Sequence, residues 1–180
     1  MLIDEFLSEY DFVETHGISI CAGAADIYRA ANETDFSESF IIRWLFRLRG
    51  LATKGVTLKS LSSSRFEILG EVPGREMLLG IVGKFWKLGG ELKKIDAVSF
   101  KKFETAGYAK AVWNFSLRPE GPNTRLSTET RIKCTDAESK KSFGFYWTFI
   151  QPFSGLIRME MLRAIKRRAE MSVPPAIAGG

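Results

Sequence analysis

Few residues of this sequence have the type and spacing that catalysis or metal binding requires. His16 is the only histidine, and Cys21 and Cys134 are the only cysteines. A lone histidine can act as an acid, a base or a polar anchor, although it is also common as a hydrogen-bonded core residue. No Ser-His-Asp triad can be assembled around this histidine. The histidine and the two cysteines also lack the spacing of zinc ligands. We therefore expect no catalytic set, metal site or cofactor.

Aromatic and hydroxyl side chains form a second group of candidates, on two alternating segments. Residues 108–117 place on one face Ala109, Ala111, Trp113, Phe115 and Leu117. Residues 124–134 place on one face Leu126, Thr128, Thr130, Ile132 and Cys134. Period-two alternation predicts strands, and turn residues at 119–123 join them into a hairpin. The opposite face is polar, so we expect a sheet with one covered and one solvent-exposed face.

A long helix is predicted over residues 136–170 as the cover of this sheet. Asp136 is suited to cap it, and Pro152 should kink or split it. Its apolar residues recur at spacings of three and four, which is typical of a buried helix face. They are Phe143, Tyr146, Trp147, Ile150, Phe153, Ile157, Met161 and Ile165.

The aromatic residues of the helix and of the strand should face the same space. Trp113 and Phe115 would then form, with the helix, either a simple core or the wall of a ligand cavity. Thr128, Thr130 or Asn114 would orient a ligand's polar end, although threonine is also a common strand residue. The single histidine, His16, shares a face with two isoleucines of the first strand.

The remaining segments predict a mixed α+β chain. A strand is expected over 11–21, a short helix over 24–32 and a second helix from Asp35, stopping at Gly50, with an apolar stripe. The stripe consists of Phe36, Ile41, Trp44, Leu45 and Leu48. Residues 66–72 and 75–86 flank Pro73-Gly74 and predict a hairpin, and 92–95 a further short strand. Residues 98–103 are ambiguous between helix and loop.

Length and charge suggest one domain that works in the cytoplasm. The chain has 180 residues, which we divide into a domain over 1–171 and a flexible tail over 172–180. Its net charge is +5, with a basic cluster late in the final helix: Arg163, Lys166, Arg167 and Arg168. No nucleic-acid-binding module accompanies this charge, so nucleic acid is not favoured as a partner. No secretory signal is evident, and two cysteines do not make a disulfide framework.

The order of these elements resembles that of the helix-grip superfamily (SRPBCC). This superfamily includes START lipid-transfer domains, birch-pollen-allergen-like proteins and polyketide cyclases/dehydrases. The segments EVPGREMLLGIVGKFW, GYAKAVWNF, TRLSTETRIKCTD and FYWTFIQPFSGLIRMEML look like those of a bacterial subgroup. The resemblance implies an α+β fold in which a curved antiparallel sheet wraps a long C-terminal helix. It also implies a cavity for a hydrophobic or amphipathic small molecule, and first and last strands that pair. Cys21 and Cys134 would then lie at opposite ends of that pair.

Three functions remain open. The leading hypothesis is a non-enzymatic binder or carrier of a small hydrophobic or lipid-like molecule. Its expected ligand-binding residues are His16, Trp113, Phe115, Thr128, Thr130, Phe143, Tyr146, Trp147 and Ile150. The second is a cyclase/dehydratase-like or isomerase-like enzyme that moves protons with His16, Tyr108, Tyr146 or Glu129. The third is a partner-binding or membrane-surface-binding domain, which would use the basic helix and residues 40–49.

Overall fold

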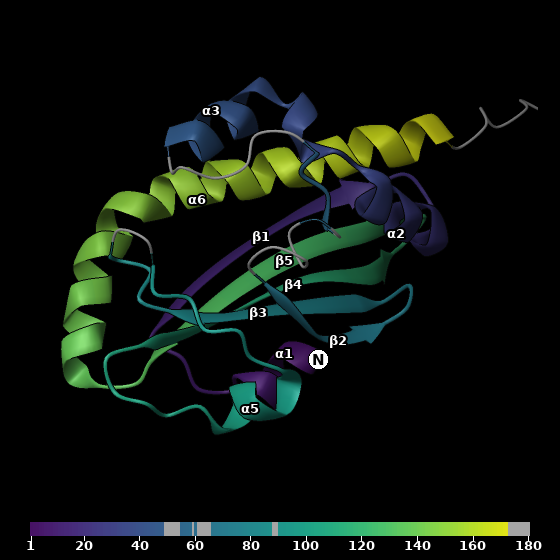
Figure 1. Ribbon diagram of the computed structural model, residues 1–180. Helices are drawn as coiled ribbons and strands as arrows, with labels where there is room; N and C mark the ends of the chain where they lie inside the picture. Colours follow the sequence, from purple (N-terminus) through teal and green to yellow (C-terminus); the bar gives the residue numbers. More distant parts are fainter. Residues whose placement is uncertain (49–54, 59, 61–65, 88–89, 173–180) are drawn as a thin grey trace, which may run out of the picture.

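The centre of the molecule is one antiparallel sheet of five strands in the spatial order β1-β5-β4-β3-β2 (Figure 1). The computed structural model describes residues 1–48, 55–58, 60, 66–87 and 90–172. The strands are β1 (Phe12–Ile20), β2 (Glu67–Val72), β3 (Glu76–Gly83), β4 (Ala109–Glu120) and β5 (Asn123–Cys134). The first and last strands pair, so Glu14 lies opposite Thr130 and His16 opposite Thr128.

The hairpin around Pro73-Gly74 has the predicted form. The Arg75 N–H donates to the Val72 carbonyl at 2.9 Å, and Gly74 has a φ of 71°. A positive φ at the third residue of a turn is typical of type II, and glycine adopts it without steric cost. The turn therefore fixes the register of β2 against β3.

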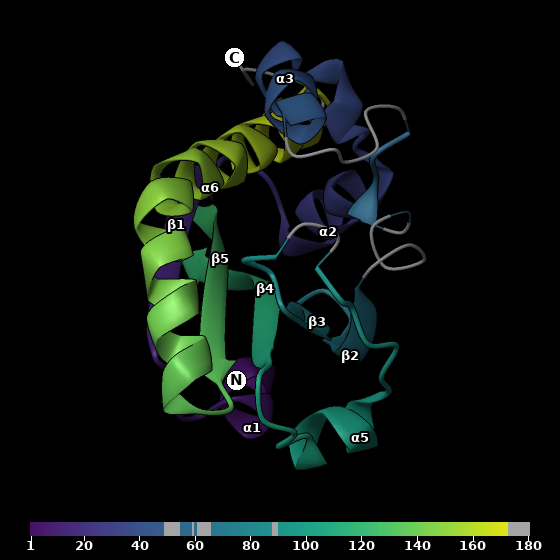
Figure 2. The same ribbon diagram turned by 60° about the vertical axis from the view of Figure 1, so that its left-hand side comes forward.

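The helix α6 (Ala137–Ser172) is the gripped element. Asp136 caps it by accepting the Ser139 N–H at 2.8 Å. The helix follows one end of the sheet and then crosses its concave face (Figures 1 and 2). It bends between these halves and contains Pro152, which removes one backbone donor. The predicted kink is thus confirmed.

Two further helices follow the first strand, as expected, and cover the rest of the concave side. They are α2 (Ala24–Glu33) and α3 (Phe40–Leu48), separated by the 3-10 turn η1 (Phe36–Glu38). α2 packs between the sheet and the end of α6, while α3 contacts α6 from outside (Figures 1 and 2). A curved sheet wrapped around a long C-terminal helix is the helix-grip architecture, and the predicted α+β fold is confirmed.

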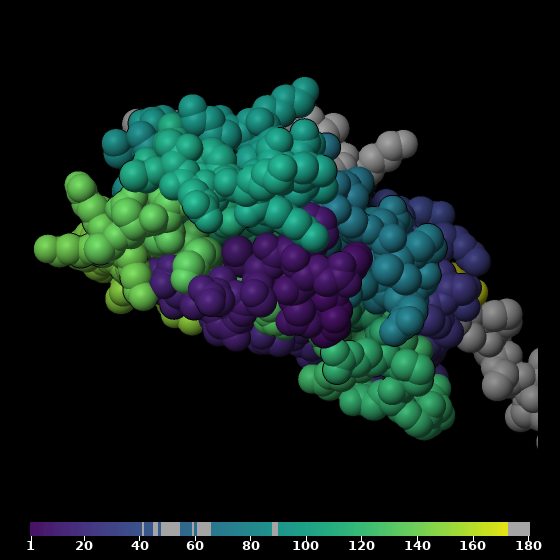
Figure 3. Space-filling view, turned by 90° about the horizontal axis from the view of Figure 1, so that it is seen from below, coloured from purple at the N-terminus to yellow at the C-terminus, as the bar shows by residue number. Residues whose placement is uncertain are grey.

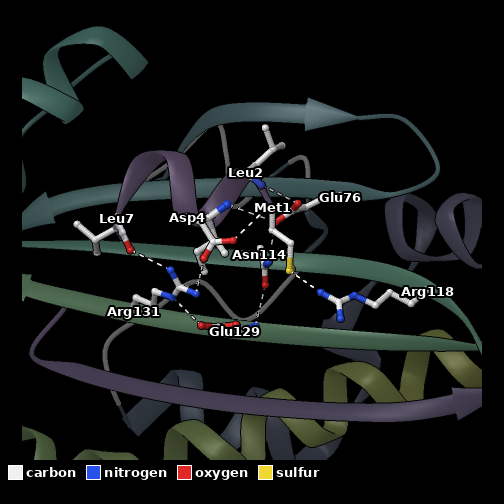
Figure 4. A network of polar contacts seen from close by, with 10 residues as sticks. Met1, Leu2, Asp4, Leu7, Glu76, Asn114, Arg118, Glu129 and Arg131 are labelled. Carbon is white, nitrogen blue, oxygen red and sulfur yellow. Dashed lines mark hydrogen bonds and ion pairs between the residues drawn. The ribbon is translucent and has the colours of Figure 1, made fainter. Parts of the chain in front are cut away.

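The convex face of the sheet is covered too, which corrects the prediction of a solvent-exposed face. α1 (Leu2–Phe6) and α5 (Ala97–Lys102) lie over it, and their segments adjoin in Figure 3. Asn114 is fully buried there, and its amide donates to Glu76 at 2.8 Å. Glu76 accepts the Leu2 N–H at 2.9 Å (Figure 4). Polar residues are buried here because α1 supplies their partners.

Arg131 completes this outer network (Figure 4). Its Nε donates to Glu129 at 2.6 Å, its Nη1 to the Leu7 carbonyl at 3.0 Å, and its Nη2 lies 2.8 Å from Asp4. Glu129 therefore belongs to the convex side. Tyr108 packs in the same outer cluster, so neither of these proton-transfer candidates faces the grip.

Several details differ from the sequence predictions. Residues 92–95 form a single bridge, between Lys93 and Val82, rather than a strand. Trp44 is half exposed because α3 turns Ile42 inward instead, and the Gly50 stop lies outside the described residues. Phe153 is also exposed, since the bend of α6 moves its buried face onto other residues. These are Ile157, Met161, Leu162, Ile165 and Ala169.

Candidate ligand-binding site

A largely enclosed acid–base pair lies at the edge of the grip, between β1 and α6. The alternation of β1 brings Glu14 and His16 to its inner face, between Phe12 and Ile18. The His16 Nε2 lies 3.0 Å from Glu14 Oε1, and the side chains are 23% and 7% exposed. The second oxygen, Glu14 Oε2, is buried and has no hydrogen-bond partner among the described residues.

Gly155 of α6 closes over this pair. A Cβ atom there would lie 2.8 Å from Glu14 Oε1 and 3.3 Å from His16 Nε2. Such a distance is below ordinary van der Waals contact, so the absence of a side chain lets the helix approach the carboxylate. The pair is therefore held between β1 and the second half of α6.

Trp113 and Thr128 lie on the neighbouring strands, where their polar groups bond each other. The indole N–H donates to the Thr128 hydroxyl at 2.6 Å, and this hydroxyl donates to the Asn114 carbonyl at 2.7 Å. The Thr128 hydroxyl is therefore already engaged within the chain. Arg158 of α6 stacks on the indole, with its Cζ 3.7 Å from the ring centre. Thr130 is buried beside Trp113, its partner across the β4–β5 ladder.

A small cavity lies between α2 and the sheet. Its volume is about 10 Å³, which holds roughly one water molecule. Phe115 is the sole predicted site residue in its lining, which also includes Ile27, Ala31 and Leu126. Tyr28 lines it as well, and its hydroxyl is buried with no hydrogen-bond partner in the described chain.

The aromatic residues of α6 form a separate cluster near the start of the helix. Phe143 is its buried centre, 5.0 Å from the Phe12 ring and 5.7 Å from the Trp147 ring. Tyr146 packs there too, and Ile150 is half buried farther along. Trp113 and Phe115 belong to another cluster, with Ile20, Met77 and Met161. The concave side thus holds two apolar clusters rather than the single space predicted.

The cysteines offer no reactive centre on this side. Cys134 is buried beside Phe143, and burial raises the pKa of its thiol to about 12, so it stays protonated. Cys21 is a free, exposed cysteine after the far end of β1, so the two lie at opposite ends of the strand pair. Within the described residues, no group of three His, Cys, Asp or Glu side chains is placed to hold a metal ion.

Sequence reasoning selected His16 but missed its partner, Glu14, and Arg158 and Tyr28. The signal for Glu14 was present, since it falls between Phe12 and His16 in the alternation of β1. Arg158 likewise falls at helical spacing from Met161 and Ile165, on the buried side of α6. A charged residue on an otherwise apolar face is a candidate for a functional role.

Comparisons with known proteins find distant structural likenesses and give no activity. No protein-family model matches this chain, and no curated protein matches it. Among solved structures, a protein from Thermus thermophilus has 13% identity and a TM-score of 0.40. The match covers 91% of this chain and 100% of that chain. The di-domain ARO/CYC protein BexL has 16% identity and a TM-score of 0.43, over 94% of this chain and 54% of its own.

A third similar structure is norcoclaurine synthase of Thalictrum, with 13% identity, a TM-score of 0.39, and coverage of 88% of this chain and 93% of that chain. Likenesses of this size do not indicate what a chain binds. The helix-grip arrangement rests on the structure itself, in which a five-stranded antiparallel sheet wraps a long C-terminal helix. Among the described residues, no helix is both long and apolar enough to span a membrane.

Proposed function

We propose that this protein binds a small hydrophobic or amphipathic molecule between the sheet and α6. The observation that carries the proposal is a pair of polar atoms on the concave side, Glu14 Oε2 and the Tyr28 hydroxyl. Both are buried and lack a hydrogen-bond partner among the described residues. Such atoms are rare in native proteins because each costs about 1–3 kcal/mol, and a bound molecule or water normally satisfies them.

The surroundings of these atoms favour an apolar ligand. Trp113 and Phe115 lie with their ring centres 5.0 Å apart on the inner face of β4. Large rings contribute most of the buried area at such sites, and the few polar groups set the ligand's orientation. Thr130 and His16 remain candidates for this second role. Thr128 contributes by holding the indole of Trp113 in place.

The test is a titration with a dansyl-labelled fatty acid, together with native mass spectrometry after mild purification. We expect saturable fluorescence enhancement. Phe115→Leu should weaken it, whereas Phe149→Leu, on the exposed side of α6, should not. Circular dichroism melting checks that both variants fold. No bound species and no titration signal across a panel of lipids and aromatic compounds would refute the proposal.

A second candidate is an enzyme of the cyclase/dehydratase or isomerase kind that uses the same site. The observation that favours it is the 3.0 Å contact between His16 and Glu14, because proton transfer requires an acid and a base in contact. The probe is the enolisable ketone β-tetralone in deuterated buffer. An enzyme would accelerate exchange of its α-protons, as followed by NMR, and Glu14→Gln would abolish the acceleration. Exchange at the buffer rate would eliminate this candidate.

A third candidate is contact with a membrane surface. The basic helix gives it less support than its charge suggests, since three of its cations are in ion pairs: Arg163–Glu160, Lys166–Glu170 and Arg168–Glu33. Exposed aromatic residues on α6 favour it more, with Phe145 and Phe149 stacked edge to face at 5.1 Å. Sedimentation with phosphatidylserine vesicles tests it. Association that survives Phe145→Ser with Phe149→Ser would exclude this surface.

A further inference from the structure

The Glu14–His16 pair brings a buried carboxylate of the inner face against the gripped helix. Glu14 comes from the first strand and Gly155 from the last helix, so the site exists only when the grip is closed. The neighbours across the ladder are Thr130 and Thr128. Trp113 follows one strand farther, opposite Thr130.

The hydrogen bonds of this carboxylate are incomplete. Oε1 pairs with His16 Nε2 at 3.0 Å, but Oε2 has no donor within the described chain, although the side chain is only 7% exposed. An ionised carboxylate accepts several hydrogen bonds, and leaving one buried oxygen without any is costly. The nearby Thr128 hydroxyl donates its single proton to the Asn114 carbonyl. Oε2 therefore offers an acceptor position to a donor of a bound molecule.

The site also has a route to solvent. The His16 side chain is 23% exposed, so the pair lies at the edge of the grip rather than in its sealed interior. Ile18 continues the inner face on one side, and Phe12 leads to the aromatic cluster around Phe143 on the other. A ligand that reaches Glu14 thus finds apolar surface in both directions along β1.

The charge nearby selects among possible donors. Arg158 stands three residues after Gly155, on the same side of α6, and its guanidinium stacks on the Trp113 indole. Its positive charge offsets part of the attraction of the carboxylate for a second cation, and an ammonium group loses more hydration than a hydroxyl group when it is buried. A neutral hydroxyl donates one hydrogen bond without this penalty. The site therefore fits a phenol, an enol or an alcohol better than an amine.

We infer that Glu14 is the anchor for a hydroxyl group on an otherwise hydrophobic ligand. Its Oε2 accepts a hydrogen bond from the hydroxyl group, and His16 orients the carboxylate through Oε1. This inference rests on the proposed function and specifies the class of ligand: a hydrophobic, ring-containing or long-chain molecule with one hydroxyl at the end that enters beneath Gly155.

The test compares β-naphthol with its methyl ether, which is similar in shape and lacks the donor. Their binding is followed by naphthalene fluorescence and by displacement of the dansyl-labelled fatty acid. We expect the wild-type protein to bind β-naphthol about fivefold to tenfold more tightly, the usual effect of one added hydrogen bond. Glu14→Leu should reduce this ratio to about one by weakening β-naphthol alone. Glu14→Gln keeps an acceptor oxygen and should give an intermediate ratio.

The controls separate anchoring from folding. Glu9→Gln changes a carboxylate that is 86% exposed and should leave the ratio at the wild-type value. Glu14→Leu removes a buried polar group without a full set of partners, so its melting temperature should not fall far below that of the wild type. His16→Gln should lower the ratio partially, since it disturbs only the orientation of Glu14.

The outcomes distinguish this inference from the proposed function. Equal affinity of both naphthalenes for the wild-type protein, or a ratio that Glu14→Leu leaves unchanged, would overturn the hydroxyl anchor while ligand binding stands. Binding of the fatty acid without binding of either naphthalene would also overturn it. Failure of every probe, the fatty acid included, would overturn the proposed function itself.

Discussion

At the scale of single residues, the Trp113–Thr128 pair is a fully hydrogen-bonded contact of the inner face. Both side chains are buried, the indole N–H has the Thr128 hydroxyl as its acceptor, and that hydroxyl bonds the Asn114 carbonyl in turn. We expect Thr128→Val to keep the shape of the side chain but to leave a buried donor unpaired. The free energy of unfolding should fall by about 1–3 kcal/mol, measured by urea denaturation.

Thr148→Val is the matched control for this change. Thr148 is exposed on α6, and substitutions at such positions usually alter stability by less than about 0.5 kcal/mol. Equal losses of unfolding free energy in the two variants would show that the hydrogen bonds of the Thr128 hydroxyl do not stabilise the fold.

Residue-level prediction of side-chain placement succeeded where a local pattern carried the information. The alternation of β1 placed His16 on the inner face, where the structure has it. The same alternation puts Glu14 on the inner face. Its enclosure depends on contact with Gly155, which is distant in the sequence, and so could not be predicted from the strand alone. The bonding of the Thr128 hydroxyl depends on its rotamer and on the position of Trp113, which no sequence pattern specifies.

At the scale of elements, α6 shows the same division between local and tertiary information. Its cap and its kink follow from Asp136 and Pro152 alone, and both were predicted correctly. The buried face beyond the kink depends on how far the helix turns there, and Phe153 was therefore wrongly placed in it. The cap has consequences for stability that depend on pH.

Hydrogen bonds from the backbone of Ser139 and Gly107 lower the pKa of Asp136 from 3.8 to about 2. Because the folded-state pKa is depressed, this stabilisation is complete above about pH 4 and is lost as the pH falls toward 2. Asp136→Asn keeps a capping side chain but has no proton to bind. We expect its urea midpoint to fall less than that of the wild type between these pH values.

The other carboxyl groups with lowered pKa values, such as Asp4 and Asp11, are common to both proteins and cancel in this comparison. Asp136→Ala, which removes the cap itself, should be less stable at every pH. Parallel curves for the wild type and Asp136→Asn would contradict the role given to the carboxylate.

Two glycines of α6 provide a second prediction for this element. Replacing a helical glycine by alanine usually adds about 1 kcal/mol to stability. At Gly144 the new Cβ would meet only Phe12, at 3.4 Å, so Gly144→Ala should realise most of this gain. At Gly155 it would press on Glu14 and disturb its contact with His16. Gly155→Ala should therefore be the less stable of the two in thermal melting, and the reverse order would show that Glu14 is free to move.

At the scale of the whole molecule, the sheet is enclosed on both sides, which the sequence did not predict. Alternation separates polar from apolar faces, but it does not show whether a polar face is in contact with water. The outer polar residues Asn114, Glu76 and Arg131 find partners in one another and in α1. The helix-grip order of elements was predictable because it follows from long patterns, whereas this cover depends on contacts between distant residues.

The proposed binding of a ligand inside an enclosed fold would have a measurable effect on unfolding. A molecule that binds only the folded state stabilises it by about 2.7 kcal/mol at a hundredfold excess over its Kd. For a chain of this length, that corresponds to a rise in melting temperature of roughly 5–10 °C. We expect the dansyl-labelled fatty acid to produce this rise and dansyl-glycine, which lacks the apolar tail, to produce none. Equal shifts with both compounds would show that the dansyl group, rather than the apolar tail, accounts for the binding.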